Sequence, residues 1–113
     1  MIRATIAVLA VLAGAKTPHA AVLRFIENHS PTDACAQLAP AYKQSLAKQY
    51  GPCLQGMRVQ PKATHVRTSH ERIHGAAATV DASYYANGQH FKELYTLVRR
   101  NGIWLITGSR QLP

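Results

Sequence analysis

The chain has 113 residues, which fits one domain, because a typical domain holds roughly 100 to 150 residues and two smaller cores would bury too little surface. Hydrophobic residues make up 47% of it and charged residues 16%, a balance that excludes the disordered class of chain. Thirteen Lys and Arg against five Asp and Glu give a net charge of +8, so we expect a weak, salt-screened attraction to anionic surfaces. Because the basic residues are scattered and no recognition motif accompanies them, no specific nucleic acid is expected as a partner.

The N-terminus has the pattern of an export signal. Met1-Ile2-Arg3 is followed by small and apolar residues from Ala4 to Ala15. This run is shorter than the ~20 residues that cross a bilayer, but it matches the core of a secretory signal. We therefore expect residues 1–15 to be a signal peptide, cleaved after Ala15, and the protein to be secreted or associated with the cell envelope. The alternative is that residues 4–15 form the first helix of a cytoplasmic domain.

The first predicted helix spans residues 18–29. Thr17 followed by Pro18 is typical of a helix start, because Thr caps the first amides and Pro fits the first turn. Val22, Phe25 and Ile26 recur at helical spacing and predict one buried face.

Two more helices are expected after the first. Ser30-Pro31 repeats the start signal and predicts a short helix that carries Cys35. Pro40 begins a third helix, and Gly51-Pro52 ends it. Cys53 to Met57 are expected to add one further turn.

The two cysteines, Cys35 and Cys53, favour a disulfide if the protein is exported. The bridge would close a loop of about 18 residues, which the chain-entropy relation values at ~3 kcal/mol. The spacing lacks the close C-x-x-C pair of structural zinc sites. Two free buried thiols are the alternative.

Beyond Pro61 the hydrophobic period changes toward two, which predicts a sheet. The expected strands cover residues 63–69, 76–86, 89–100 and 103–109. Asn87-Gly88 predicts a tight hairpin between the second and third strands, and a second Asn-Gly pair joins the third to the fourth. Helices followed by an antiparallel meander are the α+β pattern.

A family resemblance rests on this order of elements and on five short strings, at residues 21–26, 33–40, 51–53, 75–80 and 97–106. In these features the chain resembles the nuclear transport factor 2-like superfamily (cystatin-like α+β cones), in particular its small exported actinobacterial members. The resemblance implies one cone-shaped domain over residues 16–113, with three N-terminal helices on a curved four-stranded antiparallel sheet and an apolar pocket between them. It allows a homodimer. It does not fix a function, because such folds serve isomerases, dehydratases, hydrolases, ligand carriers and assembly domains.

The sharpest motif is His70-Glu71-Arg72-Ile73-His74, which fits H-E-x-x-H. In zinc metalloproteases two such His, one helical turn apart, bind the metal and the Glu activates water. Glu93 could supply a third ligand. However, the motif lies between a strand-like stretch and Gly75, which leaves no room for a helix of several turns. We therefore expect a polar turn between strands and no metal, and keep the zinc site of His70, His74 and Glu93 as an alternative.

A pocket enzyme of the isomerase type would need a carboxylate base and a hydroxyl that holds an oxyanion. The acids closest to the expected pocket are Asp81 and Glu93. Strand alternation places Asp81 on the face opposite Val80 and Tyr84, where it points to solvent if those two line the pocket. No catalytic residue is assigned.

The leading expectation is therefore an exported, non-catalytic binding or assembly domain that holds a small apolar ligand or a protein partner between helix and sheet. No cofactor is expected, because glycine-rich phosphate loops are absent. The alternatives are an isomerase or dehydratase type of pocket enzyme and the zinc protease. The side chains expected to line the site are Phe25, Tyr84, Tyr95, Leu97 and Trp104.

Overall fold

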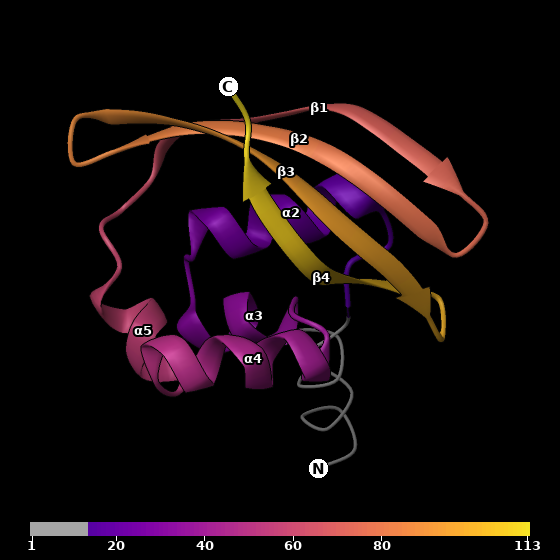
Figure 1. The fold of residues 1–113 in the computed structure, drawn as a ribbon, viewed down its shortest axis with the longest axis horizontal. Helices are drawn as coiled ribbons and strands as arrows, with labels where there is room; N and C mark the ends of the chain where they lie inside the picture. The colour runs from indigo at the N-terminus through magenta and orange to yellow at the C-terminus, as the bar shows by residue number, and fades with distance from the viewer. Residues whose placement is uncertain (1–13) are drawn as a thin grey trace, which may run out of the picture.

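The helices come first in the chain and lie on one side of the sheet (Figure 1). The computed structural model describes residues 14–113. Its helices are α2 (Pro18–Glu27), α3 (Pro31–Ala36), α4 (Pro40–Tyr50) and α5 (Cys53–Val59). The architecture is α+β. The expectation of about three helices is wrong, because α5 is a helix in its own right. The strands also hold more residues than the helices. Gly51, with φ of 83°, ends α4, and Pro52 leads directly into α5.

The predicted cap residues begin the first two helices. The Thr17 side chain accepts a hydrogen bond from the Ala20 amide, and the Ser30 side chain accepts one from the Asp33 amide, both at 3.3 Å. A proline follows each cap in the first turn, where its missing N–H has no partner to lose. Both helix starts are therefore set by local chemistry.

The sheet is a meander in the order β1-β2-β3-β4, all antiparallel. The strands are β1 (Thr64–His74), β2 (Ala77–Ala86), β3 (Gln89–Arg100) and β4 (Ile103–Gln111). Asn87 and Gly88, with φ of 51° and 74°, form the predicted two-residue turn between β2 and β3. Register shifts break the pairing twice between β1 and β2 and once between β3 and β4. Such bulges increase bending and twist, and Figure 1 shows the sheet arched over the helices.

The core lies between α2 and the inner face of the sheet. Alternation places Ala78, Val80 and Ala82 of β2 on this face, all at most 5% exposed. The other main contributors are Val22, Ile26, Leu38, Tyr95, Leu97, Trp104 and Ile106. This packing fixes α2 against the sheet and so positions the cleft beside it.

The free edge of β4 is covered by backbone from the helical half. Both backbone groups of Ile106 form hydrogen bonds to it: the amide donates to the Gln37 carbonyl and the carbonyl accepts from the Ala39 amide, both at 2.8 Å. The Trp104 amide donates to the Ala15 carbonyl at 3.0 Å. These bonds satisfy groups that an open sheet edge would leave unpaired.

The predicted signal peptide falls mostly on residues 1–13, which lie outside the described part of the chain. Within residues 14–113, no helix is both long enough and apolar enough to cross a bilayer.

Candidate functional site

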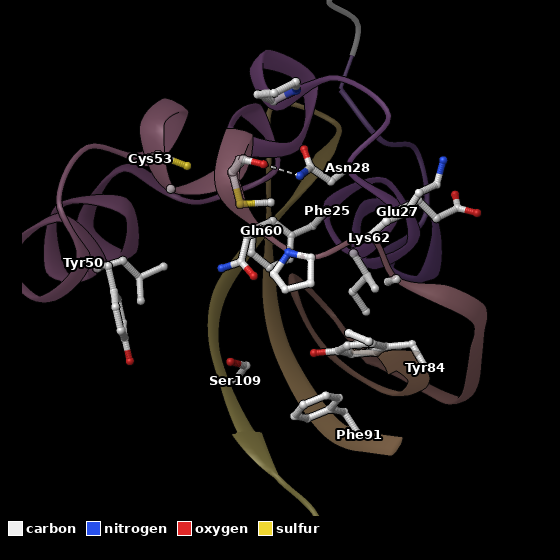
Figure 2. A pocket seen from close by; sticks show the side chains of 18 of the residues that line it. Phe25, Glu27, Asn28, Tyr50, Cys53, Gln60, Lys62, Tyr84, Phe91 and Ser109 are labelled. Atoms are coloured by element: carbon white, nitrogen blue, oxygen red, sulfur yellow. Dashed lines mark hydrogen bonds between the residues drawn. The ribbon is translucent and has the colours of Figure 1, made fainter. Parts of the chain in front are cut away.

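An open pocket of about 750 Å³ lies where the end of α2, the α4 and α5 helices and the β2–β3 hairpin meet. Figure 2 shows this pocket with side chains from helices and strands directed toward it. The side chains on its sheet side come from β2, β3 and the end of β4, and those on its helical side from α2, α4, α5 and the segment that leads to β1. Its lining residues include Phe25, Tyr42, Gly56, Met57, Tyr84, Phe91, Glu93, Tyr95 and Ser109.

Four aromatic side chains, Phe25, Tyr84, Phe91 and Tyr95, form an aromatic floor. Tyr84 and Phe91 are cross-strand partners whose rings stack with centroids 5.3 Å apart, as Figure 2 shows. Phe25 of α2 meets Tyr95 edge to face at 6.3 Å. Stacked and edge-to-face pairs of this kind hold rings in defined positions. The floor is therefore a preformed apolar surface.

A carboxylate lies within this aromatic surface. The Tyr95 hydroxyl donates to Glu93 Oε1 at 2.7 Å. Beside this pair, the Tyr42 hydroxyl of α4 and the Ser109 hydroxyl of β4 are 3.2 Å apart. The sheet side of the pocket thus combines the Glu93 carboxylate with several hydroxyl groups.

Both tyrosines next to Glu93 keep their protons over a wide pH range. Burial raises the pKa of Tyr84 and Tyr95 above the usual range. The negative charge of Glu93 raises the pKa of both further, and the hydrogen bond that the Tyr95 hydroxyl donates to Glu93 adds to the rise at Tyr95. The Tyr95 hydroxyl is therefore a donor toward the carboxylate.

The helical wall of the pocket is held by a covalent and a polar contact. The predicted disulfide is present: Cys35 of α3 is bonded to Cys53 of α5, with the two Cα atoms 6.0 Å apart. The Asn28 side-chain amide donates to the Met57 carbonyl at 2.6 Å, seen as the dashed line in Figure 2. Because no residue of α5 is buried, these two contacts are its main attachments.

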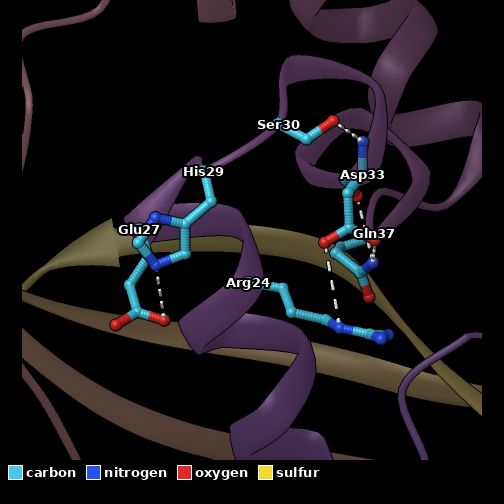
Figure 3. A network of polar contacts seen from close by, with 6 residues as sticks. All are labelled: Arg24, Glu27, His29, Ser30, Asp33 and Gln37. Carbon is cyan, nitrogen blue, oxygen red and sulfur yellow. Dashed lines mark hydrogen bonds and ion pairs between the residues drawn. The ribbon is translucent and has the colours of Figure 1, made fainter. Parts of the chain in front are cut away.

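Polar contacts fix α3, and with it Cys35, against the end of α2 (Figure 3). Arg24 Nε lies 3.8 Å from Asp33 Oδ2, and the buried Gln37 side chain donates to the Asp33 carbonyl at 3.0 Å. Figure 3 shows the Arg24 side chain reaching from α2 toward α3. The disulfide partner of α5 therefore sits on an anchored element.

Of the five side chains expected to line a binding site, the structure places three on the wall of this pocket, namely Phe25, Tyr84 and Tyr95. Leu97 and Trp104 do not line this pocket and are buried in the core. They share the inner face of the sheet with the aromatic floor but lie toward the β3–β4 turn, away from the β2–β3 end. Alternation predicted their face correctly, but it carries no information on position along the strand.

Sequence reasoning missed Phe91 and Tyr42, and gave Glu93 as an acid near the expected pocket and as a ligand of the alternative zinc site. The two-residue turn at Asn87-Gly88 could have placed the first and last of these. A turn of that length pairs Tyr84 with Phe91 and Ala82 with Glu93, which puts both side chains on the face of Tyr84. No sequence signal brings Tyr42 of α4 to the same place.

The H-E-x-x-H segment is the end of strand β1, so neither the expected turn nor the helix of a zinc protease forms there. Ser69 pairs with Asp81 and Arg72 with Thr79, which leaves His70 and Glu71 in a bulge, and His70 has φ of 52°. Among residues 14–113, no group of three or more His, Cys, Asp or Glu side chains is arranged to hold a metal ion.

The bulge sends the motif's side chains to separate partners. Glu71 Oε1 accepts from the His19 amide at 3.1 Å and lies 3.2 Å from His19 Nδ1, at the N-terminus of α2. His70 instead lies 3.2 Å from Asp81. A carboxylate at a helix N-terminus is stabilising because it meets the positive end of the helix dipole. Glu71 therefore has a structural role in fixing α2 to the sheet.

Comparison with known proteins shows a fold and no family. No protein-family model matches the sequence, and no curated protein matches it. The chain is similar to the solution structure of a SEC-C motif-containing protein from Rhodopseudomonas palustris, with a TM-score of 0.65 and 15% identity. The similarity covers 93% of this chain and 86% of that one.

The expected membership of the nuclear transport factor 2-like superfamily is therefore wrong, because the matching structure is a SEC-C motif protein and nothing found supports that superfamily. The expectation rested on the order of elements and on short strings, and neither defines a family. At 15% identity the likeness to the SEC-C motif protein concerns the fold alone.

Proposed function

We propose that the protein is an exported binding domain that holds a small, largely apolar ligand in the pocket between α2 and the β2–β3 hairpin. The observation that carries this proposal is the aromatic floor inside a cavity of about 750 Å³. That volume lies within the range of roughly 300 to 1,000 Å³ typical of small-molecule sites, which are mostly apolar with a few placed polar groups. The disulfide supports an oxidising compartment, and the signal-like N-terminus supports export.

Gly56 offers a way to close the pocket without disturbing the fold. It lines the cavity from α5, and a Cβ added there meets nothing within 4 Å. We expect Gly56→Trp to fill the cavity and abolish binding while the thermal unfolding curve is retained. Leu54→Trp is the matched control, because Leu54 lies on the same helix, is 41% exposed and does not line the pocket.

The measurement is native mass spectrometry of protein exported from its host, followed by titration with the small molecule that co-purifies. Binding to wild type and to Leu54→Trp, with loss in Gly56→Trp, supports the proposal. Equal binding by all three proteins would place the ligand elsewhere and defeat it.

A pocket enzyme of the isomerase type is the second candidate, because Glu93 and the hydroxyls of Tyr84 and Tyr95 meet in one cavity. A carboxylate and hydroxyl donors are the groups that such a reaction needs. The raised pKa of both tyrosines makes them weaker proton donors, and Tyr95 already occupies the carboxylate, so binding is favoured over catalysis. Proton exchange at the α-carbon of an enolisable ketone, lost in Glu93→Gln, would establish the enzyme instead.

A further inference from the structure

The acidic residues of this chain are few, and their partners can all be compared. There are five, and all lie within the described residues. Four contact a basic side chain: Glu27 meets His29, Asp33 meets Arg24, Glu71 meets His19, and Asp81 meets His70 and Arg72. The fifth, Glu93, forms no ion pair within residues 14–113.

Glu93 lacks an ion-pair partner among the described residues although the chain has thirteen Lys and Arg and six His. Glu93 also lines the pocket, half-buried beside the aromatic floor, whereas Glu27, the other acid at the pocket, contacts His29. The basic side chains that line the pocket, such as Arg58 and Lys62, are exposed and none forms an ion pair with Glu93. A partly desolvated charge is costly unless a counter-charge or hydrogen bonds stabilise it.

The surroundings of Glu93 favour one kind of counter-charge. Tyr95 donates to one carboxylate oxygen of Glu93 at 2.7 Å. This hydrogen bond holds the Glu93 side chain in place, and the carboxylate can still accept further hydrogen bonds. The nearby rings of Tyr84, Phe91 and Phe25 present faces and edges, and aromatic faces attract cations. A carboxylate set among aromatic rings is suited to a ligand with an apolar body and a positively charged nitrogen.

We infer that the ligand of this pocket is an aromatic or apolar amine whose protonated nitrogen pairs with Glu93, with its apolar body on the aromatic floor. This inference rests on the proposed function, because it specifies the ligand class of the same pocket. The overall charge of +8 repels cations, so a preference for the amine must come from the local site and cannot come from the general surface.

The test compares two probes of nearly equal shape, tryptamine and tryptophol, which differ by an ammonium in place of a hydroxyl. Binding is measured at pH 7 by NMR titration, with pocket signals as the readout. We expect tryptamine to bind wild type at least about tenfold more tightly than tryptophol, as a charge-assisted hydrogen bond provides. Glu93→Gln should remove that difference. Asp81→Asn is the matched control, because its carboxylate lies outside the pocket, and it should keep the difference.

The outcomes separate this inference from the proposed function. If both probes shift the pocket signals with equal affinity in wild type, the amine inference is overturned and the apolar pocket stands. If neither probe shifts those signals, both are overturned. The wild-type comparison needs no variant, so it decides the matter even if Glu93→Gln unfolds.

Discussion

Reduction of the Cys35–Cys53 disulfide should destabilise the protein by about 3 kcal/mol. The two cysteines are 18 residues apart in the sequence, and closing a loop of that length costs the unfolded chain about this much entropy. Packing of the cross-linked helices in the native state does little to offset this loss, because neither α4 nor α5 has a buried residue. For a domain of this size the melting temperature should fall by roughly 12 to 24 °C.

The assay is urea unfolding of the oxidised and the reduced protein, followed by the fluorescence of Trp104. This single tryptophan is 3% exposed in the core, on β4, so its signal reports the sheet and not the cross-linked helices. Reduction keeps both side chains, which avoids the extra cavity that Cys35→Ala would leave at a buried site.

Amide hydrogen exchange distinguishes global from local loss of structure. The reduced protein should lose protection first in α5, since the hydrogen bond from Asn28 to the Met57 carbonyl is then its main remaining attachment. A stability loss below about 1 kcal/mol, with α5 still protected, would refute the reasoning that the bridge holds this wall of the pocket.

Three further predictions address the rest of the structure. Glu71→Gln should lower the free energy of unfolding by about 0.3 to 1 kcal/mol, since it removes the charge at the N-terminus of α2; no change in urea unfolding would contradict that role. Leu97→Ala should cost about 2 to 5 kcal/mol in the same assay, and Leu105→Ala, on a partly exposed position, clearly less. Because folding raises the pKa of Tyr84 and Tyr95, the stability they add is complete below the unfolded value of about 10 and declines as pH rises above it. Unfolding free energies between pH 8 and 11 should therefore decline more steeply in wild type than in Tyr84→Phe or Tyr95→Phe, and equal slopes would contradict the shifts.

Features that depend on neighbouring residues in the sequence were predictable. The caps at Thr17 and Ser30 and the Asn87-Gly88 turn form as expected, and the third strand has the predicted bounds of 89–100. Each of these depends on hydrogen bonds or backbone angles within a few residues. The disulfide was also predicted, although from the even cysteine count and the expected compartment, not from geometry.

The extent of the first strand was not predictable in the same way. It was expected to end at residue 69 but continues to His74 through two bulges, in which His65 and His70 have positive φ. Non-glycine residues seldom adopt this conformation, and no Gly or Asn marks either position. The bulges arise from the pairing of β1 with β2, so a reading of β1 alone found a turn and a metal motif where the structure has a strand.

The candidate site shows the same division between local and distant information. Strand alternation predicted which side chains lie on the inner face of the sheet. That Glu93 lacks an ion-pair partner among the described residues is seen only once the partners of the other four acids are known from the structure. Glu71 contacts His19, which is 52 residues away in the sequence, and Asp81 of β2 contacts His70 of the neighbouring strand β1. Contacts of this kind pair four of the five acids with basic side chains. The single carboxylate left without a basic partner in the described chain then lies on the aromatic floor, where the proposed amine ligand would supply the missing charge.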